Sequence, residues 1–316
     1  FASSISGDFN AENISKRLGS YDVFGSTEIN MNSKFSFRPG VRIMFSSQFD
    51  TQQAISLSTK YSFTKDFDIR LIAGTSPRVP NYDELYSYFV DVNHNVQGNA
   101  NLNPENGKSA FIHLRKKHNF NTIQSESKLS GWLIDVSDRI ELIIVNSTPL
   151  EYKFMNIDTY KTRGVSYNNH LKYNDFSGNI GITYAGMAKQ MTENNGGDDF
   201  LYAMQFNLNG SYTFPKTKTT ISAFYKYNGS MYQYIQTTDI AQNVSLVKGK
   251  REAFSWLDAS VKQNFLSDKF EVTLGARNLL NVVDISSNIE QSDAHTVGSG
   301  NLNLGYGRSF FFKLVY

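Results

Sequence analysis

The chain has 316 residues, a formal net charge of +2, no cysteine, and an aromatic content of 14%. Near-neutral charge, with acidic and basic residues interspersed, argues against nucleic acid as a partner. The 24 Phe and 18 Tyr exceed the needs of a modest core in a chain that is only 40% hydrophobic. No run approaches the roughly 18 to 20 apolar residues of a membrane-spanning helix, whereas a barrel needs only every second residue to be apolar.

Alternation of apolar and polar residues is the dominant pattern, and it begins at residues 35–45. One face of this stretch carries the apolar side chains Phe35, Phe37, Pro39, Val41, Ile43 and Phe45. The same period of two recurs in residues 55–63, 67–74, 165–173, 179–186, 204–214, 220–228, 257–265 and 270–278. The pattern predicts an all-β protein with about 13 strands and no helix.

Strand length favours a transmembrane antiparallel β-barrel over a soluble β-sandwich or propeller, which remains the alternative fold. The predicted strands run to ten residues or more, close to the roughly 9 to 11 that a tilted strand needs to cross a bilayer. Strands of soluble sandwiches are usually about five or six residues long. Tyr and Phe also sit near the ends of the apolar faces, for example Tyr61, Phe63, Tyr173, Tyr212 and Phe214, where headgroups favour amphipathic rings.

Short and long connections alternate along the chain, which predicts the orientation of the barrel. The short links are 64–66, 215–218 and 266–269, and the long polar ones are 77–107, 146–158, 190–199, 229–252 and 286–300. Barrels of the outer membrane have short periplasmic turns and long extracellular loops. The C-terminus is therefore predicted in the periplasm. Thirteen strands are an odd number for a closed bacterial barrel, so either the count is off by one or part of the barrel lies outside this chain.

Three stretches resemble the C-terminal barrel of TonB-dependent receptors. The first is TSPRVP at 75–80, with DELY at 83–86 and GNANLNPE at 98–105; the second is GARNLLN at 275–281. The third is GRSFFF at 307–312, in a last strand that ends on an aromatic residue. Ser76, Val79 and Ala100 depart from the usual residues of the first stretch.

The resemblance implies that residues 1–316 are about the last 13 strands of a barrel that has 22 in the family, with the N-terminal plug and the first strands absent. It also implies active import across a bacterial outer membrane, with energy delivered through TonB. The implied cargo is a scarce metal chelate, either haem or a ferric siderophore, with cobalamin as the alternative. The implied partners are outer-membrane lipid, TonB, the chelate and a surface lipoprotein.

The connection at 77–107 is the main candidate for ligand binding, because a link of about 30 residues is uncommon unless it is functional or disordered. Its aromatic residues offer flat contact area, and their hydroxyls add direction. The predicted ligand-binding residues here and in the connection at 229–252 are Arg78, Tyr82, Tyr86, Tyr88, His94, Asn99, Asn101, Tyr232 and Tyr234. Arg78, with Pro77 and Pro80, also fits a structural role at the strand exit, and Glu105 is expected to anchor the return of the loop.

His94 is also the one predicted metal ligand. Haem receptors of the family carry a histidine in the corresponding loop, so the resemblance implies that His94 binds haem iron. The alternative is an ordinary polar residue within Val92–Val96. Haem enters this hypothesis as a transported ligand, and no resident cofactor is predicted.

Catalysis has no support in the sequence. The chain lacks cysteine, a G-x-S-x-G motif and a phosphate-binding loop, so an outer-membrane lipase or protease is disfavoured and no enzyme is predicted. The alternative of another class is a passive porin or an adhesin barrel, which would lack the three stretches above.

Overall fold

The computed structural model describes residues 2–5, 8–9, 14–15, 17–91, 95–147, 150–192, 195–238, 244–266, 269–287, 300–303 and 305–316. Side chains are described within 17–91, 95–146, 151–190, 199–232, 248–266, 269–287 and 305–316. In this part of the chain no helix is long and apolar enough to cross a membrane.

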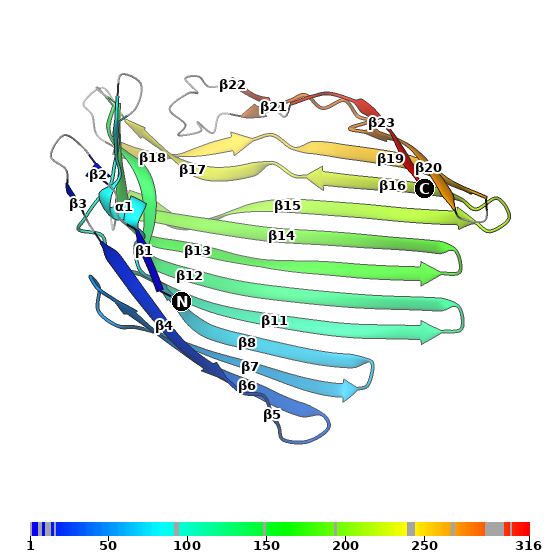
Figure 1. Cartoon of the computed structure of the whole chain (residues 1–316), viewed down its shortest axis with the longest axis horizontal. Coiled ribbons are helices and arrows are strands. Elements are labelled where there is room, and N and C mark those ends of the chain that lie inside the picture. Colours follow the sequence, from blue (N-terminus) through cyan, green and yellow to red (C-terminus); the bar gives the residue numbers. More distant parts are fainter. Residues whose placement is uncertain are drawn as a thin grey trace.

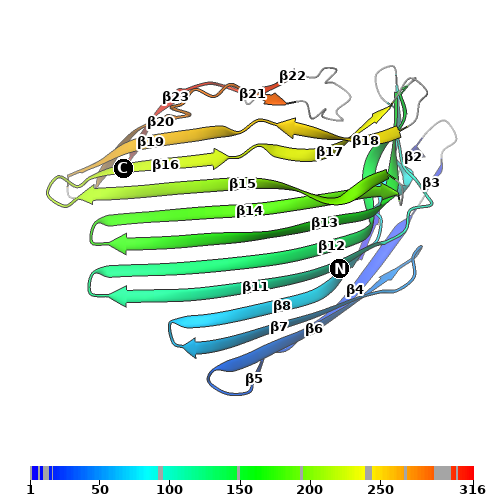
Figure 2. The same ribbon diagram turned by 180° about the vertical axis from the view of Figure 1, so that it is seen from behind.

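Thirteen long strands form one curved, open antiparallel wall (Figure 1). Each strand pairs with the next one along the wall, and β4 and β23 lie at its opposite edges in both views (Figures 1 and 2). In wall order the strands are β4 (Leu18–Ser26), β6 (Phe35–Ser46), β7 (Gln52–Thr64), β8 (Phe67–Arg78), β11 (Glu105–Phe120), β12 (Ile123–Ser147), β13 (Leu150–Tyr173), β14 (Phe176–Thr192), β15 (Asn195–Phe214), β16 (Thr219–Asn228), β19 (Phe254–Phe265), β20 (Phe270–Arg277) and β23 (Ser309–Val315). The predicted antiparallel all-β wall and its strand number are confirmed.

Shorter elements gather at the ends of the wall. The short helix α1 (Tyr82–Tyr86) lies at the end opposite the C-terminus (Figure 1). The remaining strands are β1 (Ala2–Ile5), β2 (Asp8–Phe9), β3 (Ile14–Ser15), β5 (Ile29–Asn30), β9 (Tyr88–Val90), β10 (Asn95–Gln97), β17 (Met231–Thr238), β18 (Val244–Arg251), β21 (Asp284–Ser287) and β22 (Gly300–Asn303). The expectation of no helix is therefore wrong, because Asn81 and Glu84 form a capping box that starts α1.

Most of the predicted long loops contain strand. The links at 146–158, 190–199 and 229–252 were expected as polar loops, but β12 and β13 pair from Ser147 and Leu150 onward and β17 pairs with β18. Hairpins therefore continue past the membrane, since backbone pairing does not require an apolar face once the strand has left lipid. The predicted short links at 64–66 and 215–218 are confirmed as tight turns, and Lys218 lies in the left-handed region of φ. The predicted link at 266–269 lies partly outside the described residues. Two further turns, at 121–122 and 174–175, place Asn121 and Asn174 in the same region of φ.

Cross-strand register places the apolar residues of neighbouring strands in continuous rows. One row runs Ile180, Leu208, Tyr225, Leu257, and another runs Ile221, Val261, Leu274, Phe312. Many of these side chains are exposed in the isolated chain, for example Leu208 at 47% and Leu274 at 58%. The rows form a continuous apolar band, which is the surface that a barrel presents to lipid.

The opposite face of the same strands is polar and faces the lumen. His170 contacts Asn179 (Nδ1 to Oδ1, 2.9 Å), and the Asn179 amide donates to Asn209 (2.9 Å) across three neighbouring strands. Within the band, successive side chains of a strand therefore face lipid and the aqueous lumen alternately.

The buried core lies where the segment between β8 and β11 packs against wall strands β12 and β13. Leu85, Leu102 and Ile140 form one cluster, at 3%, 3% and 7% exposure, and Tyr86 and Phe154 pack against it. The segment that the sequence predicted as the main ligand loop thus contributes two of the three residues of this buried cluster.

Candidate functional site

Arg78 organises the segment between β8 and β11, here called the clasped segment (residues 79–104). Its guanidinium donates to Glu105 through Nε (2.9 Å) and Nη2 (2.5 Å), and Nη1 donates to both carboxylate oxygens of Glu84 (3.0 and 2.9 Å). A planar guanidinium satisfies two carboxylates in this way because its donors point in fixed directions. The predicted anchoring role of Glu105 is confirmed, and Arg78 closes both ends of the segment.

Glu84 links the ion pair to α1. Its Oε2 accepts from the backbone N–H of Asn81 (2.8 Å), while the Glu84 N–H donates to Oδ1 of Asn81 (2.9 Å). One side chain therefore caps the helix and neutralises Arg78. Sequence reasoning missed this role, although the spacing Asn81-x-x-Glu84 is a recognisable capping signal.

Glu105 stays charged although it lies half-buried outside the membrane. Burial alone would raise its pKa, but hydrogen bonds from Arg78 and from the backbone N–H of Ile140 (2.8 Å), together with the charges of Arg78 and Arg139, hold the pKa below its ordinary value. The same hydrogen bond to Glu105 raises the pKa of Arg78. The pair is ionised at neutral pH, and it ties β8, β11 and β12 together.

Amide side chains fasten the end of the clasped segment to β12 and β13. Asn99 donates to the Phe154 carbonyl (3.0 Å), and the amide of Asn156 accepts from Asn103 N–H (2.8 Å) and donates to its carbonyl (3.0 Å). Asn156 also donates to the carbonyl of Asp138 (2.6 Å), whose φ of 54° breaks the regular course of β12. Nothing in the local sequence marks Asn156 or Asp138, because their partners are distant in the chain.

Tight backbone contact explains Gly98. Its N–H donates to the Ser87 carbonyl (2.6 Å), and a Cβ here would come within 2.6 Å of backbone atoms of Leu85 and Tyr86. Only glycine lets the chain pass so close to α1.

The predicted ligand residues of this segment divide by exposure. Tyr82 is only 3% exposed, and its ring contacts that of Tyr86 at 5.3 Å between centroids. Tyr86 donates from its hydroxyl to Gln48 (2.6 Å). Tyr88 is 49% exposed, and its neighbour Phe89 on β9 is 53% exposed.

The remaining predicted residues lie elsewhere. Asn101 is exposed, and its N–H donates to Asn99 Oδ1 (3.0 Å). Tyr232 lies on β17 with Lys248 Nζ at 4.4 Å from its ring centroid and Lys250 Nζ at 6.0 Å. The backbone of Tyr234 pairs with Lys248. His94 lies outside the described residues, and among those described no group of three or more His, Asp or Glu could hold a metal ion.

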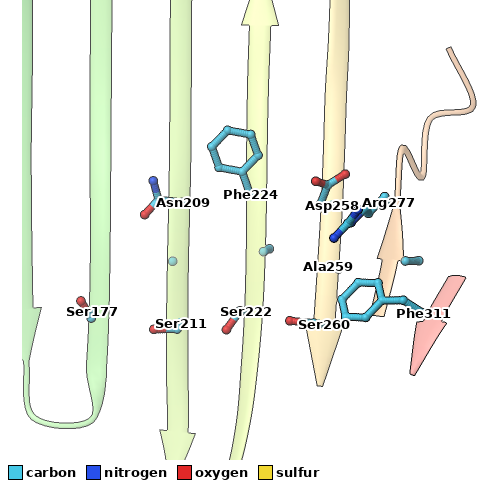
Figure 3. Close-up of a pocket in the computed structure, with 13 residues that line it drawn as sticks. Ser177, Asn209, Ser211, Ser222, Phe224, Asp258, Ala259, Ser260, Arg277 and Phe311 are labelled. Carbon is cyan, nitrogen blue, oxygen red and sulfur yellow. The ribbon is translucent and has the colours of Figure 1, made fainter. Parts of the chain in front are cut away.

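The lumen wall near the periplasmic turns carries a polar hollow of about 360 Å³ (Figure 3). Its floor is a row of hydroxyls from four neighbouring strands: Ser177, Ser211, Ser222 and Ser260. Asn209 and Asp258 line the next row, and Arg277 lies with its guanidinium 5.2 Å from the Phe311 ring centroid. This surface offers donors and acceptors to whatever fills the lumen, and it contains no nucleophile and base pair.

The stretch at 275–281 builds the extracellular end of the last hairpin. Asn278, 1% exposed with φ 52°, accepts from and donates to the backbone of Val282 (2.9 and 2.8 Å), and its own N–H donates to Asp258 (2.8 Å). Asn281 accepts from the N–H of Arg308 (2.9 Å). Gly275 lies under the Phe311 ring, which leaves no room for a Cβ. Gly275, Asn278 and Asn281 therefore each have a local structural role.

This arrangement is characteristic of one protein family. Residues 2–279 match the family described as "TonB dependent receptor-like, beta-barrel". The chain belongs to this family. It is a wall of an outer-membrane barrel, with the C-terminus on the periplasmic side and the long connections outside. The family is one of receptors rather than enzymes.

Solved structures similar to this receptor barrel share its fold at low sequence identity. The FrpB iron transporter from Neisseria meningitidis (F3-3 variant) has a TM-score of 0.69 at 13% identity, covering 94% of this chain and 45% of that one. A mutant of the ferric enterobactin receptor PfeA from Pseudomonas aeruginosa has 0.69 at 15%, covering 96% and 45%. The copper transporter OprC has 0.70 at 14%, covering 98% and 51%. The chain thus spans about half the length of these proteins, and a search of the curated proteins finds no match.

Proposed function

We propose that this chain is the C-terminal barrel portion of an outer-membrane receptor that imports a metal chelate with energy delivered through TonB. The observation that carries the proposal is family membership over residues 2–279. The similar folds of proteins described as iron, ferric enterobactin and copper transporters support a metal chelate as the cargo class. In this proposal the plug, the TonB-binding segment and the remaining strands belong to the rest of the receptor.

Charge and aromatic surface on β17 and β18 favour an anionic cargo. Tyr232 is flanked by Lys248 and Lys250, and Lys250 pairs with Glu252 at 2.8 Å. Aromatic faces with nearby cations suit ligands that combine flat rings with negative charge. A ferric siderophore with anionic aromatic donors has both features, and haem, with a flat ring and two carboxylates, is the second candidate.

Energy dependence is the direct test of transport. Cells expressing the full-length receptor are offered iron-labelled ferric enterobactin, haemin or labelled cobalamin, with and without a functional TonB system. We expect saturable uptake of one of the two iron chelates only when TonB is present. Equal uptake of that chelate in both strains would contradict active transport and support a passive pore, and uptake of cobalamin alone would contradict an iron chelate as the cargo.

The ligand surface is tested separately by replacing Tyr232 and Lys248 with Ala. Loss of one ring contact and one charge is expected to weaken chelate binding by about tenfold or more. Lys216→Ala, in the exposed turn after β15, is the matched control and should leave binding unchanged. Unchanged binding in the double variant would remove this surface from the site without touching the transport proposal.

Haem binding through His94 has its own optical readout. If His94 is an axial ligand, titration of the receptor with haemin should shift the Soret band, and His94→Ala should remove that shift. An identical spectrum in both proteins would eliminate the ligand role of His94.

A further inference from the structure

A cationic cluster lies on the outer face of the wall, away from the lumen. Lys108, Asp135 and Lys161 stand directly opposite one another on β11, β12 and β13. Arg163 lies two residues from Lys161 on the same face of β13. Three cations and one carboxylate give this cluster a net charge of +2 beside the apolar rows of the same face.

Register shows that the cluster shares its face with the lipid-facing rows. The next row toward the periplasm is Ala110, Leu133, Arg163, and the one after it is Ile112, Gly131, Val165, Tyr184. Leu133 is 59% exposed and Val165 45%. The cations therefore point outward, toward lipid.

Their height matches the outer headgroup layer. A strand rises about 3.3 Å per residue, and a tilt of about 40° leaves about 2.5 Å per residue along the membrane normal. Arg163 lies ten residues beyond Tyr173, the aromatic residue at the periplasmic turn, which places it about 25 Å above that turn. The apolar band of such barrels is about 25 Å tall, so Arg163 lies at its upper rim and both lysines lie just above it.

Aromatic neighbours hold Arg163 in place. Its Nε donates to the Tyr202 hydroxyl (2.6 Å), its guanidinium lies 3.8 Å from the centroid of the Phe200 ring, and Tyr202 stacks on Tyr184 at 4.8 Å. The Arg163 side chain is still exposed. An arginine fixed in this way keeps outward donors for an anion while it loses little further conformational freedom.

Two hollows meet at this cluster. The upper one, about 400 Å³, is lined by Lys108, Lys161, Arg163 and Phe200. The lower one, about 590 Å³ and almost wholly apolar, is lined by Leu57, Leu71, Ala73 and Ile112. Ala110 and Leu133 line both, so the hollow that holds the cations at headgroup height continues into an apolar groove along the hydrocarbon.

We propose that this outer face is a specific site for a phosphate-bearing lipid of the outer leaflet. Lys108, Lys161 and Arg163 bind the headgroup phosphate, and one acyl chain lies in the groove between Leu71 and Leu133. Charge complementarity selects phosphate, since guanidinium and ammonium groups are its usual partners, and the attached groove selects a lipid over a free ion. This site is independent of the cargo and of TonB.

Binding of bisphosphorylated lipid A to the full-length receptor in detergent tests the site, with native mass spectrometry as the readout. Each lost cation is expected to weaken binding about fivefold, so Lys108→Gln with Lys161→Gln should weaken it about 25-fold. Lys116→Gln is the control, because Lys116 is an exposed lysine on the same face of β11 near the periplasmic end. Heat-dependent gel mobility shows that each variant is folded.

A second variant and two ligands separate lipid from free phosphate. Ala110→Phe fills the groove but keeps every charge, and it should weaken lipid A binding without changing the cationic cluster. Dephosphorylated lipid A and inorganic phosphate should each bind far more weakly than bisphosphorylated lipid A. Equal affinity for the dephosphorylated lipid, equal affinity for inorganic phosphate, or unchanged binding in the double lysine variant would overturn the proposal.

Discussion

The wall from β4 to β23 and the clasped segment at residues 79–104 use apolar side chains in opposite ways. In the wall, Leu208 and Leu133 are 47% and 59% exposed in the isolated chain, and lipid is the solvent that covers them. In the clasped segment, Leu85 and Leu102 are each 3% exposed, and other side chains cover them. The wall therefore depends on its membrane, while the segment depends on packing and on one arginine.

The largest expected loss of stability comes from placing a charged side chain on the lipid-facing side of the wall. Leu208→Arg places a charge near the middle of the apolar band and should destabilise the barrel by about 2 to 4 kcal/mol. Gln205→Arg, on the lumen face of the same strand, should change stability little because the charge remains in water. Denaturant unfolding in liposomes measures both, and equal effects would contradict the alternation of lipid and lumen faces.

The next effect concerns packing of the clasped segment. Gly98→Ala forces a Cβ against backbone atoms of α1 and should destabilise the segment by about 1 to 3 kcal/mol. Gly25→Ala in β4 is the matched control, because no atom lies within 4 Å of a Cβ there. Hydrogen exchange of residues 80–104 measures the stability of the clasped segment. Similar exchange rates in both variants would show that the close approach of Gly98 to α1 does not matter for this stability.

Replacing Arg78 tests how far its ion pairs with Glu84 and Glu105 stabilise the clasped segment. Arg78→Ala leaves Glu84 and Glu105 without their shared cation, and it should open the segment by about 1 to 2 kcal/mol, because the Arg78 side chain is 41% exposed and water screens part of the loss. Arg78→Lys keeps the positive charge but loses the forked donors of the guanidinium. The stability of its clasped segment should therefore lie between that of the parent and that of Arg78→Ala. Protease cleavage within 80–104 is the measurement, and protection equal to that of the parent would refute the clasp.

The smallest of these effects is expected from acid, which should weaken the ion pair between Arg78 and Glu105 and so destabilise the clasped segment. The pKa of Glu105 is lowered in the folded chain, so its contribution is complete above the unfolded pKa of about 4.3 and is lost as the pH falls below that value. Hydrogen-exchange protection of the clasped segment should be constant from pH 7 to about pH 5 and fall below about pH 4. Arg78→Ala should reduce this pH dependence, because only the Ile140 N–H and the charge of Arg139 then lower the pKa of Glu105. A parent protein whose protection stays constant down to pH 3 would contradict the prediction.

Strand positions and lipid-facing residues were predictable because a half-buried strand repeats with period two. The predicted segment 35–45 matches β6 to within one residue, and the predicted segment 257–265 lies within β19, which begins three residues earlier. The predicted loops at 146–158 and 190–199 were wrong, because hairpins outside lipid keep backbone pairing without an apolar face. Ligand contact by the nine predicted site residues stays a prediction.

The alternating wall, its turns and the exposure of its aromatic rings could be predicted from residue order, because these features depend on neighbours one or two residues apart. The ion pairs of Arg78 with Glu84 and Glu105, and the hydrogen bonds by which Asn156 joins Asn103 to Asp138, became apparent from the folded chain alone. The folded chain also shows that Lys108, Lys161 and Arg163 share one outward hollow. These contacts join residues up to 55 positions apart, and strand register, which local patterns do not encode, brings them together.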